Sequence, residues 1–260
     1  MTADGVHPAA RTGYTAGAAA YERGRPAYPP EAVAWLLEGL ALDEGDAVLE
    51  LGAGTGKLTR LLVDAGLRVV AVEPVAAMRE RLATLGPAVR ALDATAEALP
   101  LADASLPGAI AATSLHWTDV PRALAQLDRV LAAGATVGLV WNLRDTTVAW
   151  QRELDALFSV YRGDVPSSRD GRWQAAVEAS PAWSIAASAR WDWTLQTNVR
   201  GVLDRVGSVS FIARLSAEEI ARVEAQVRAI LANAFVQTDD AAPIAFPYVE
   251  EAYLLRRDGG

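Results

Sequence analysis

Short apolar runs alternate with helix-like segments over the first 145 positions of the chain. The apolar runs predict strands at 47–51, 67–72, 88–92, 108–113 and 136–141. Between them, apolar residues recur every three or four positions, as on one face of a helix. Strands that alternate with helices at this spacing predict a parallel sheet with helices on both faces, which is a doubly wound α/β fold.

The pattern loosens in the second half of the chain, where elements are placed from local signals. Alternation favours strands at 190–196 and 247–255, and we expect helices at 148–161, 173–178 and 216–232. Local capping signals accompany two of the helices. Asp119 and Gly134 are expected to begin and end the helix of 120–131. Ser216 and Glu219 form a capping-box sequence at the start of the 216–232 helix.

No internal repeat or low-complexity linker divides the 260 residues, so we expect one domain over 1–260. Its parts would be a lead-in over about 1–30, a core over 31–145, and a cap with the last strands over 146–260. The prolines, aromatics and arginines of 21–30 fit two roles, an ordered segment that packs on the sheet or a lid over a ligand.

Three alternating glycines follow the first strand, at Gly52, Gly54 and Gly56. They allow a sharp turn and leave bare backbone on which a flat ligand can rest, at the start of a helix. A phosphate-binding P-loop does not fit, because Leu51 and Leu58 occupy its required Gly and Ser/Thr positions. A dinucleotide fingerprint does not fit either, because the spacing is G-x-G-x-G instead of G-x-G-x-x-G.

An acid, Glu73, ends the second strand at about 20 residues after the first glycine. Nucleotide-binding folds of this class place there the carboxylate that accepts hydrogen bonds from ribose hydroxyls. Such a carboxylate also helps to balance a cationic ligand. The alternative is an acid that faces the N-terminus of the next helix. On that helix, Met78 either touches an adenine edge or fills the core.

The amino-acid composition argues against several kinds of functional site. Without cysteine and with two histidines, the chain has no thiolate chemistry and no expected metal site. Its 32 acidic and 24 basic residues give a net charge of −8, which argues against a nucleic-acid partner. No apolar run is long enough to span a bilayer, and 1–13 has no export signal. We therefore expect a cytoplasmic protein that acts away from membranes.

Several of these segments together resemble a small-molecule class I S-adenosylmethionine-dependent methyltransferase. They are the glycine loop with Glu50, the pair Glu73-Pro74, the segment 94–100, and His116-Trp117 through Trp141-Asn142. The Tyr21 to Pro29 lead-in and the His-Trp pair are similar to the ubiquinone-type and trans-aconitate-type branch. The resemblance covers about residues 14–145. It implies S-adenosyl-L-methionine as cofactor and seven strands in the order 3-2-1-4-5-7-6, the last one antiparallel, with a helical cap.

The resemblance also implies which residues contact the cofactor. They are Tyr21, Arg25, Glu50, Gly52, Ala53, Gly54, Gly56, Glu73, Pro74, Met78, Thr95, Ala96, Glu97 and Ser114. One position departs from the family, because Thr95 stands where an acid or amide often reaches the adenine amino group. The hydroxyl of Thr95 is shorter, so the resemblance is weakest there.

Methyl transfer from a sulfonium is an in-line displacement, in which the protein aligns the nucleophile and excludes water. The fourth strand ends at Ser114, so His116 would lie near the transferred methyl group. His116 is therefore the candidate general base, and the alternative is a structural imidazole.

Side chains near the later strand ends are candidates for the acceptor site. Arg144 either holds an acceptor carboxylate or forms a surface ion pair. Three tryptophans either pack in the core or cover an acceptor, namely Trp117, Trp141 and Trp150.

The expected activity is O-, N- or C-methylation of a small-molecule acceptor by a monomer or homodimer. The alternative is a relative that binds the cofactor but acts as a non-methylating catalyst or as a regulator. An amino-methyltransferase of nucleic acids is disfavoured, because Thr113-Ser114-Leu115-His116 replaces the Asn/Asp-Pro-Pro-aromatic motif of those families.

Overall fold

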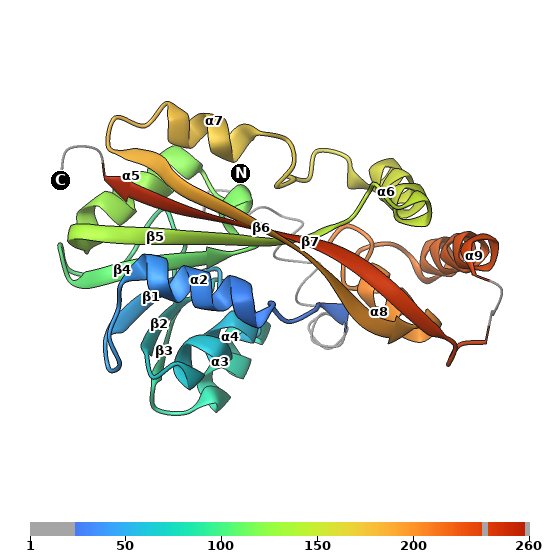
Figure 1. The fold of residues 1–260 in the computed structure, drawn as a ribbon, viewed down its shortest axis with the longest axis horizontal. Helices are drawn as coiled ribbons and strands as arrows, with labels where there is room; N and C mark the ends of the chain where they lie inside the picture. The colour runs from blue at the N-terminus through green and yellow to red at the C-terminus, as the bar shows by residue number, and fades with distance from the viewer. Residues whose placement is uncertain (1–23, 236–238, 258–260) are drawn as a thin grey trace.

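The computed structural model describes residues 24–235 and 239–257 (Figure 1). Strands and helices alternate up to β5, as the sequence pattern predicts, except that no helix separates β3 from β4 in the described chain. In chain order the elements are α2 (Pro30–Leu40), β1 (Ala47–Leu51), α3 (Lys57–Asp64), β2 (Arg68–Val72), α4 (Ala76–Leu82), β3 (Val89–Leu92), β4 (Leu106–Ala112), α5 (Val120–Val130), β5 (Leu131–Arg144), α6 (Ala149–Arg162), α7 (Arg172–Glu178), β6 (Trp183–Asn198), α8 (Val199–Gly207), α9 (Ala217–Ala234) and β7 (Pro243–Arg257).

Seven strands form one sheet in the order β3-β2-β1-β4-β5-β7-β6. The pairs β3–β2, β2–β1, β1–β4 and β4–β5 are parallel, and β7 runs antiparallel to β5 and to β6. The predicted order and the antiparallel last strand are both confirmed. The strand order reverses between β1 and β4, and ligands of open α/β sheets bind at the carboxyl ends of the strands at such a reversal.

Helices cover both faces of the sheet, and three more helices extend it at one end (Figure 1). One buried cluster packs α2, α3 and α4 against β1 and β2. A second cluster packs α5 and α7 against the other face. A third cluster joins α6, α8 and α9 to the ends of β6 and β7, at the side toward which β5 points. We call these three helices, with the segments 163–171 and 208–215, the cap.

The second half of the chain departs most from the predicted elements. Helix α8 was not expected, and β6 and β7 are longer than their predicted ranges. Helix α5 ends at Val130, one residue before its predicted end, but Gly134 is not its stop signal: Leu131 is buried and already extended, and pairs with Leu106 of β4. Gly134 lies inside β5 with a φ of 77°. The predicted cap residues Asp119 and Ser216 do accept hydrogen bonds at their helix starts.

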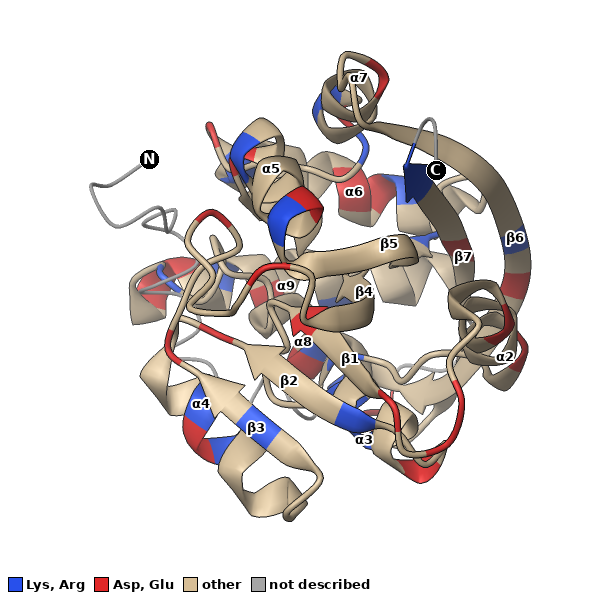
Figure 2. Ribbon diagram, turned by 90° about the vertical axis from the view of Figure 1, so that its left-hand side faces the viewer, with Lys and Arg blue, Asp and Glu red and all other residues tan. Residues whose placement is uncertain are grey.

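Acidic and basic segments are interleaved on the face that Figure 2 presents, so neither charge dominates it. Within the two described ranges, no helix combines the length and the apolar character that a bilayer span requires. The same ranges contain no group of three His, Asp or Glu side chains arranged to hold a metal ion.

Candidate functional site

The glycine loop has the backbone that its sequence predicts. Gly52, Gly54 and Gly56 have φ angles of 66°, 60° and 87°, in a region that glycine adopts readily and other residues rarely. Close packing adds a second constraint, since a Cβ built on Gly52 would lie 2.6 Å from Cβ of Ser114. The Ser114 hydroxyl donates to the carbonyl oxygen of Leu51 at 2.5 Å. A hydrogen bond therefore joins the end of β4 to the end of β1, the two strands between which the strand order reverses.

Glu73, directly after β2, is joined to the same loop. Its Oε2 accepts from the Gly54 N–H at 2.9 Å and its Oε1 from the Val75 N–H at 2.8 Å. Burial raises the pKa of Glu73, against the lowering effect of these two N–H groups and of Arg79. Each carboxylate oxygen has a second acceptor position. The geometry is compatible with ribose binding, which stays a prediction.

Glu50 is a buried acid at the end of β1, 1% exposed. The Thr59 hydroxyl donates to its Oε2 at 2.6 Å. Burial raises the pKa of Glu50 to about 8; the hydrogen bond from Thr59 lowers it, and the nearby Glu73 carboxylate raises it. At neutral pH the ligand-free protein therefore holds Glu50 mostly protonated.

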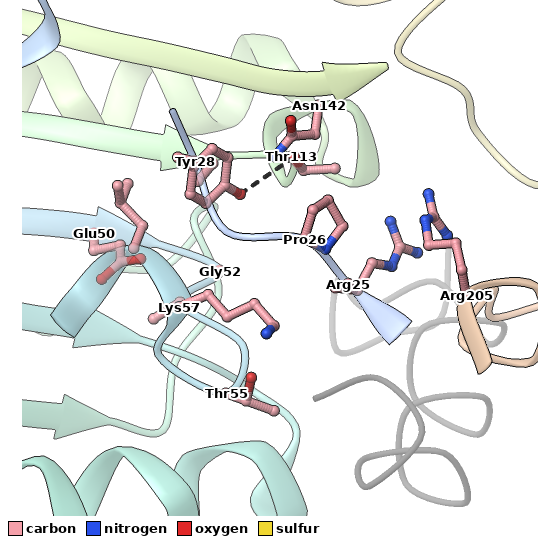
Figure 3. Close-up of a pocket in the computed structure, with 13 residues that line it drawn as sticks. Arg25, Pro26, Tyr28, Glu50, Gly52, Thr55, Lys57, Thr113, Asn142 and Arg205 are labelled. Atoms are coloured by element: carbon pink, nitrogen blue, oxygen red, sulfur yellow. Dashed lines mark hydrogen bonds between the residues drawn. The ribbon is translucent and has the colours of Figure 1, made fainter. Parts of the chain in front are cut away.

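A hollow opens above the glycine loop (Figure 3). Among the predicted cofactor residues, Arg25, Glu50, Gly52 and Ala53 line it. Further lining residues were not predicted as contacts, namely Pro26, Tyr28, Thr55, Lys57, Leu58, Ala112, Thr113, Asn142 and Arg205.

Three of these unpredicted residues have polar groups suited to a ligand. Lys57 is the only lysine of the chain, and its amine points into the hollow in Figure 3. The Thr55 hydroxyl is buried without a hydrogen-bond partner in the described part of the chain. Tyr28 lies with its hydroxyl 3.5 Å from Oγ1 of Thr113, a β-branched residue with the rare φ of 53°.

The other predicted cofactor residues lie beside the loop or in the core. Met78 and Ala96 are buried at 2% and 6% exposure, which favours the core role for Met78. Thr95 forms a bridge with Ala98. Glu97 accepts the Asp119 N–H at 2.8 Å and so supports the start of α5. Pro74 follows Glu73 and is half-buried. Tyr21 lies outside the described residues.

His116 follows β4 in a short turn of 3₁₀ helix, Leu115–Trp117. Its Nδ1 accepts the indole N–H of Trp141 at 3.1 Å. A neutral imidazole whose Nδ1 is an acceptor has its proton on Nε2, so the second nitrogen is a donor. Burial and the positive charge of Arg25 lower the pKa of His116 to about 3, against the opposing effect of Asp170. This geometry does not suit the predicted general base, because the lone pair that would take a proton is already used.

The three predicted acceptor tryptophans have different surroundings. Trp117 lines a second cavity, beyond the hollow. Trp141 is 1% exposed and stacks on Trp173 with the ring centroids 4.5 Å apart, so it supports His116 from behind. Trp150 does not belong to the site, because it packs edge-on against Phe235 and Phe246 in the core of the cap.

The second cavity has a volume of about 130 Å³ and lies between the strand ends and the cap. It shares Arg25, Thr113, Asn142 and Arg205 with the hollow, so the two are adjacent. Arg144, the predicted acceptor residue, also lines it. Three further charged residues come from α6 and the loop after it, namely Asp155, Arg162 and Arg169.

Arg144 forms an ion pair, one of the two roles that the sequence suggested, and its role in holding an acceptor carboxylate stays a prediction. Its guanidinium donates to Oδ1 of Asp155 at 2.5 Å, and it also faces the cavity. Burial and the charge of Arg205 lower the pKa of Arg144 to about 10, although Asp155 opposes the shift. Sequence reasoning missed Arg162, Arg169 and Arg205, because the arginines are spread along the chain and only the fold brings these together.

Comparison with known proteins identifies relatives of this arrangement. Residues 49–139 match the family model described as a methyltransferase domain. The chain is 38% identical over 230 residues to an uncharacterized methyltransferase of Mycobacterium tuberculosis, covering 88% of this chain and 89% of the relative. It is 32% identical over 208 residues to an uncharacterized methyltransferase-like protein of Schizosaccharomyces pombe, covering 80% of this chain and 81% of that one.

A solved structure from Anaeromyxobacter dehalogenans has a similar fold. That protein, provisionally described as a type II methyltransferase, is 25% identical to this chain with a TM-score of 0.66. The match covers 89% of this chain and 97% of the other.

Proposed function

The chain belongs to the class I S-adenosylmethionine-dependent methyltransferases, and on that premise we propose that it methylates a small-molecule acceptor by in-line displacement. The observation that supports this most directly is the hydrogen bond from the Gly54 N–H to Glu73. It joins the bare glycine loop to an acid on the neighbouring strand, beside the reversal of strand order. This is where a doubly wound sheet binds an adenosyl group.

The residues of the hollow fit S-adenosylmethionine by charge. The carboxylate of the ligand would be held by Lys57 and Arg25. Its positively charged sulfur would lie near Glu50, which lines the same hollow. Thr55 offers a buried hydroxyl without a partner in the described ranges. Glu73 would bind the ribose, and the bare backbone at Gly52 would let the ligand approach closely.

When bound, S-adenosylmethionine supplies a methyl group that its positive sulfur already activates. The chain then has to place the acceptor in line and to keep water out. The second cavity shares four lining residues with the hollow, so an acceptor seated there would lie next to the cofactor site. The cap encloses this cavity with Phe158, Val165 and Phe211.

His116 would orient the acceptor as a hydrogen-bond donor. Its Nε2–H is the free side of the ring, since Trp141 occupies Nδ1. Of the described residues that line the cavity, Asp155 is the one acid, and it pairs with Arg144 and Arg162. The site therefore suits an acceptor atom that is nucleophilic without losing a proton to the protein.

Isothermal titration with S-adenosylmethionine and with its demethylated product tests this function. We expect Glu73→Gln to weaken both ligands about tenfold or more, since an amide cannot replace a carboxylate that accepts two hydroxyls. Glu250→Gln is the matched control, because Glu250 is also a buried acid but lies on β7, whereas Glu73 is hydrogen-bonded to the glycine loop. Equal affinity in the wild type and Glu73→Gln would refute the ribose assignment.

A screen of small molecules for methyl incorporation then separates the enzyme from its alternative. Cofactor binding with no methyl transfer to any acceptor would favour a regulator or a non-methylating catalyst.

A further inference from the structure

The second cavity is much more positive than the protein around it. Among the residues that the structure describes, five arginines and one aspartate line it. The whole chain has a net charge of −8. The five come from separate parts of the sequence, namely Arg25, Arg144, Arg162, Arg169 and Arg205. A protein that concentrates its arginines in one internal space uses them to attract anions.

The acid in the lining cannot balance this charge. Asp155 is shared between Arg144, at 2.5 Å, and Arg162, at 3.9 Å. Arg169 donates to the carbonyl oxygen of Arg144, a neutral partner, and the acid that its charge acts on, Asp145, is not among the lining residues. The Nε of Arg144 is buried and has no hydrogen-bond partner in the described residues.

The arginines also repel one another. The charges of Arg205 and Arg169 both contribute to the lowered pKa of Arg144. Arg205 is 7% exposed and is held in place by Tyr248 and Ser208, at 3.2 and 3.4 Å. These side chains are therefore preorganised, and an anion between them would relieve the repulsion.

We propose that this cavity binds an anionic group of the methyl acceptor, a carboxylate or a phosphate, through Arg144, Arg162 and Arg169. That the bound molecule is the acceptor rests on the proposed function, whereas anion binding itself does not. A guanidinium presents two parallel N–H groups that match the oxygen pair of a carboxylate or phosphate.

The rest of the lining limits the kind of molecule attached to the anion. A volume of about 130 Å³ has room for on the order of ten waters, which is the size of a small organic acid. Phe158 and Phe211 form an apolar wall, and the Arg144 guanidinium lies 4.4 Å from the Phe158 ring centroid. A short carbon skeleton would therefore lie beside the bound anion.

Direct titration of simple anions into the full chain, without cofactor, tests the inference. Succinate and inorganic pyrophosphate represent the two sources, and neutral succinamide is the control ligand at equal ionic strength. We expect at least one anion to bind and succinamide not to bind. The anion that binds more tightly indicates whether the acceptor has a carboxylate or a phosphate. No binding of either anion to the wild type at millimolar concentration would overturn the proposal.

Four substitutions separate this site from a non-specific charge effect. Arg162→Gln and Arg169→Gln should each lower the affinity for the more tightly bound anion about tenfold, the usual effect of losing one charge-assisted hydrogen bond. Arg222→Gln removes an arginine that is paired with an acid on α9, outside the cavity, and should change nothing. Asp155→Asn releases two arginines and should tighten binding severalfold. Equal anion affinity in all four variants would contradict the site.

Titration of S-adenosylmethionine into the same variants keeps the two proposals apart. Anion binding that depends on Arg162, with no cofactor binding to the wild type, would refute the proposed function and leave the anion site standing. Cofactor binding that depends on Glu73, with no anion binding, would refute the anion site and leave the proposed function standing.

Discussion

The indole N–H of Trp141 donates to Nδ1 of His116 at 3.1 Å. The two residues are on neighbouring strands of the sheet, since Trp141 belongs to β5 and His116 follows β4. The hydrogen bond fixes the tautomer of a buried imidazole and directs its Nε2–H outward. A residue that looks like a general base in the sequence therefore becomes a donor in the fold.

Trp141→Phe should free this imidazole. Removing the indole leaves a buried acceptor without its donor, which costs about 1–3 kcal/mol beyond the loss of ring volume. Trp183→Phe is the matched control, because Trp183 is as buried but its N–H has no hydrogen-bond partner in the described residues. Denaturant unfolding should show a larger loss of unfolding free energy for Trp141→Phe than for Trp183→Phe. Equal losses in the two variants would argue against the hydrogen bond.

Nitrogen NMR on a His7→Gln background, where His116 is the one remaining histidine, reports the tautomer directly. We expect the Nε2–H form in the wild type and a mixture of both forms in Trp141→Phe. A dominant Nδ1–H form in the wild type would instead restore the base role.

Gly52→Ala should disrupt the loop for two reasons that can be separated. The new Cβ would stand 2.6 Å from Cβ of Ser114, and the backbone has a φ of 66°. Gly134→Ala controls for the backbone alone, since its φ is 77° and nothing lies within 4 Å of a built Cβ. We expect Gly134→Ala to lower the free energy of unfolding by about 1–2 kcal/mol and Gly52→Ala to lower it clearly more.

Adding Ser114→Gly should remove only the steric part of this loss, although it also removes the hydrogen bond from Ser114 to Leu51. In a double-mutant cycle, Gly52→Ala should therefore lower the unfolding free energy less on the Ser114→Gly background than on the wild type. If Gly52→Ala lowered it equally on both backgrounds, the contact between the two strand ends would not be what excludes a side chain at Gly52.

Local patterns were sufficient to predict the strands β1 to β5 and the glycine loop, whereas the strand order was implied by the family resemblance. Apolar runs placed every strand from β1 to β5, and alternate glycines required a left-handed backbone at Gly52, Gly54 and Gly56. The end of α5 was predicted to within one residue, but Gly134 is not its stop signal. Tertiary pairing of Leu131 with Leu106 begins the next strand before Gly134 is reached.

The acceptor side could not be predicted in the same way, because its residues meet only after folding. Arg162, Arg169 and Arg205 are separated by up to 43 positions and belong to no motif. Trp150 was misassigned for the same reason, as nothing in the local sequence indicates that it faces Phe246 instead of the cavity. Helix α8, which positions Arg205, follows a strand without a turn signal.

Lys57→Met should weaken S-adenosylmethionine about tenfold, because a charge-assisted contact to the ligand carboxylate is lost. Arg60→Met is the control, since it removes a positive charge on the same helix, α3, from a residue that does not line the hollow. Titration calorimetry measures both. The same affinity in Lys57→Met as in Arg60→Met would remove Lys57 from the cofactor site.

Glu50 should make both stability and cofactor binding depend on pH. Its folded pKa of about 8 lies above the ordinary value of 4.5, so the folded state keeps a proton that the unfolded state has lost. The contribution of Glu50 to the free energy of unfolding is then complete below pH 4.5. It falls by about 1.4 kcal/mol per pH unit as the pH rises, and is lost above about 8. Glu50→Gln never ionises and keeps an oxygen to accept the Thr59 hydroxyl.

The stability of Glu50→Gln relative to the wild type should therefore rise from pH 5 to 8 and level off above that. A positively charged sulfur near Glu50 favours the ionised acid, so at pH 7 S-adenosylmethionine should release a proton on binding, whereas the uncharged thioether product should not. Calorimetry in two buffers of different ionisation enthalpy measures the proton. Equal proton release for both ligands, or the same release in Glu50→Gln, would show that this acid does not face the charged sulfur, and the orientation proposed for the cofactor would have to be reversed.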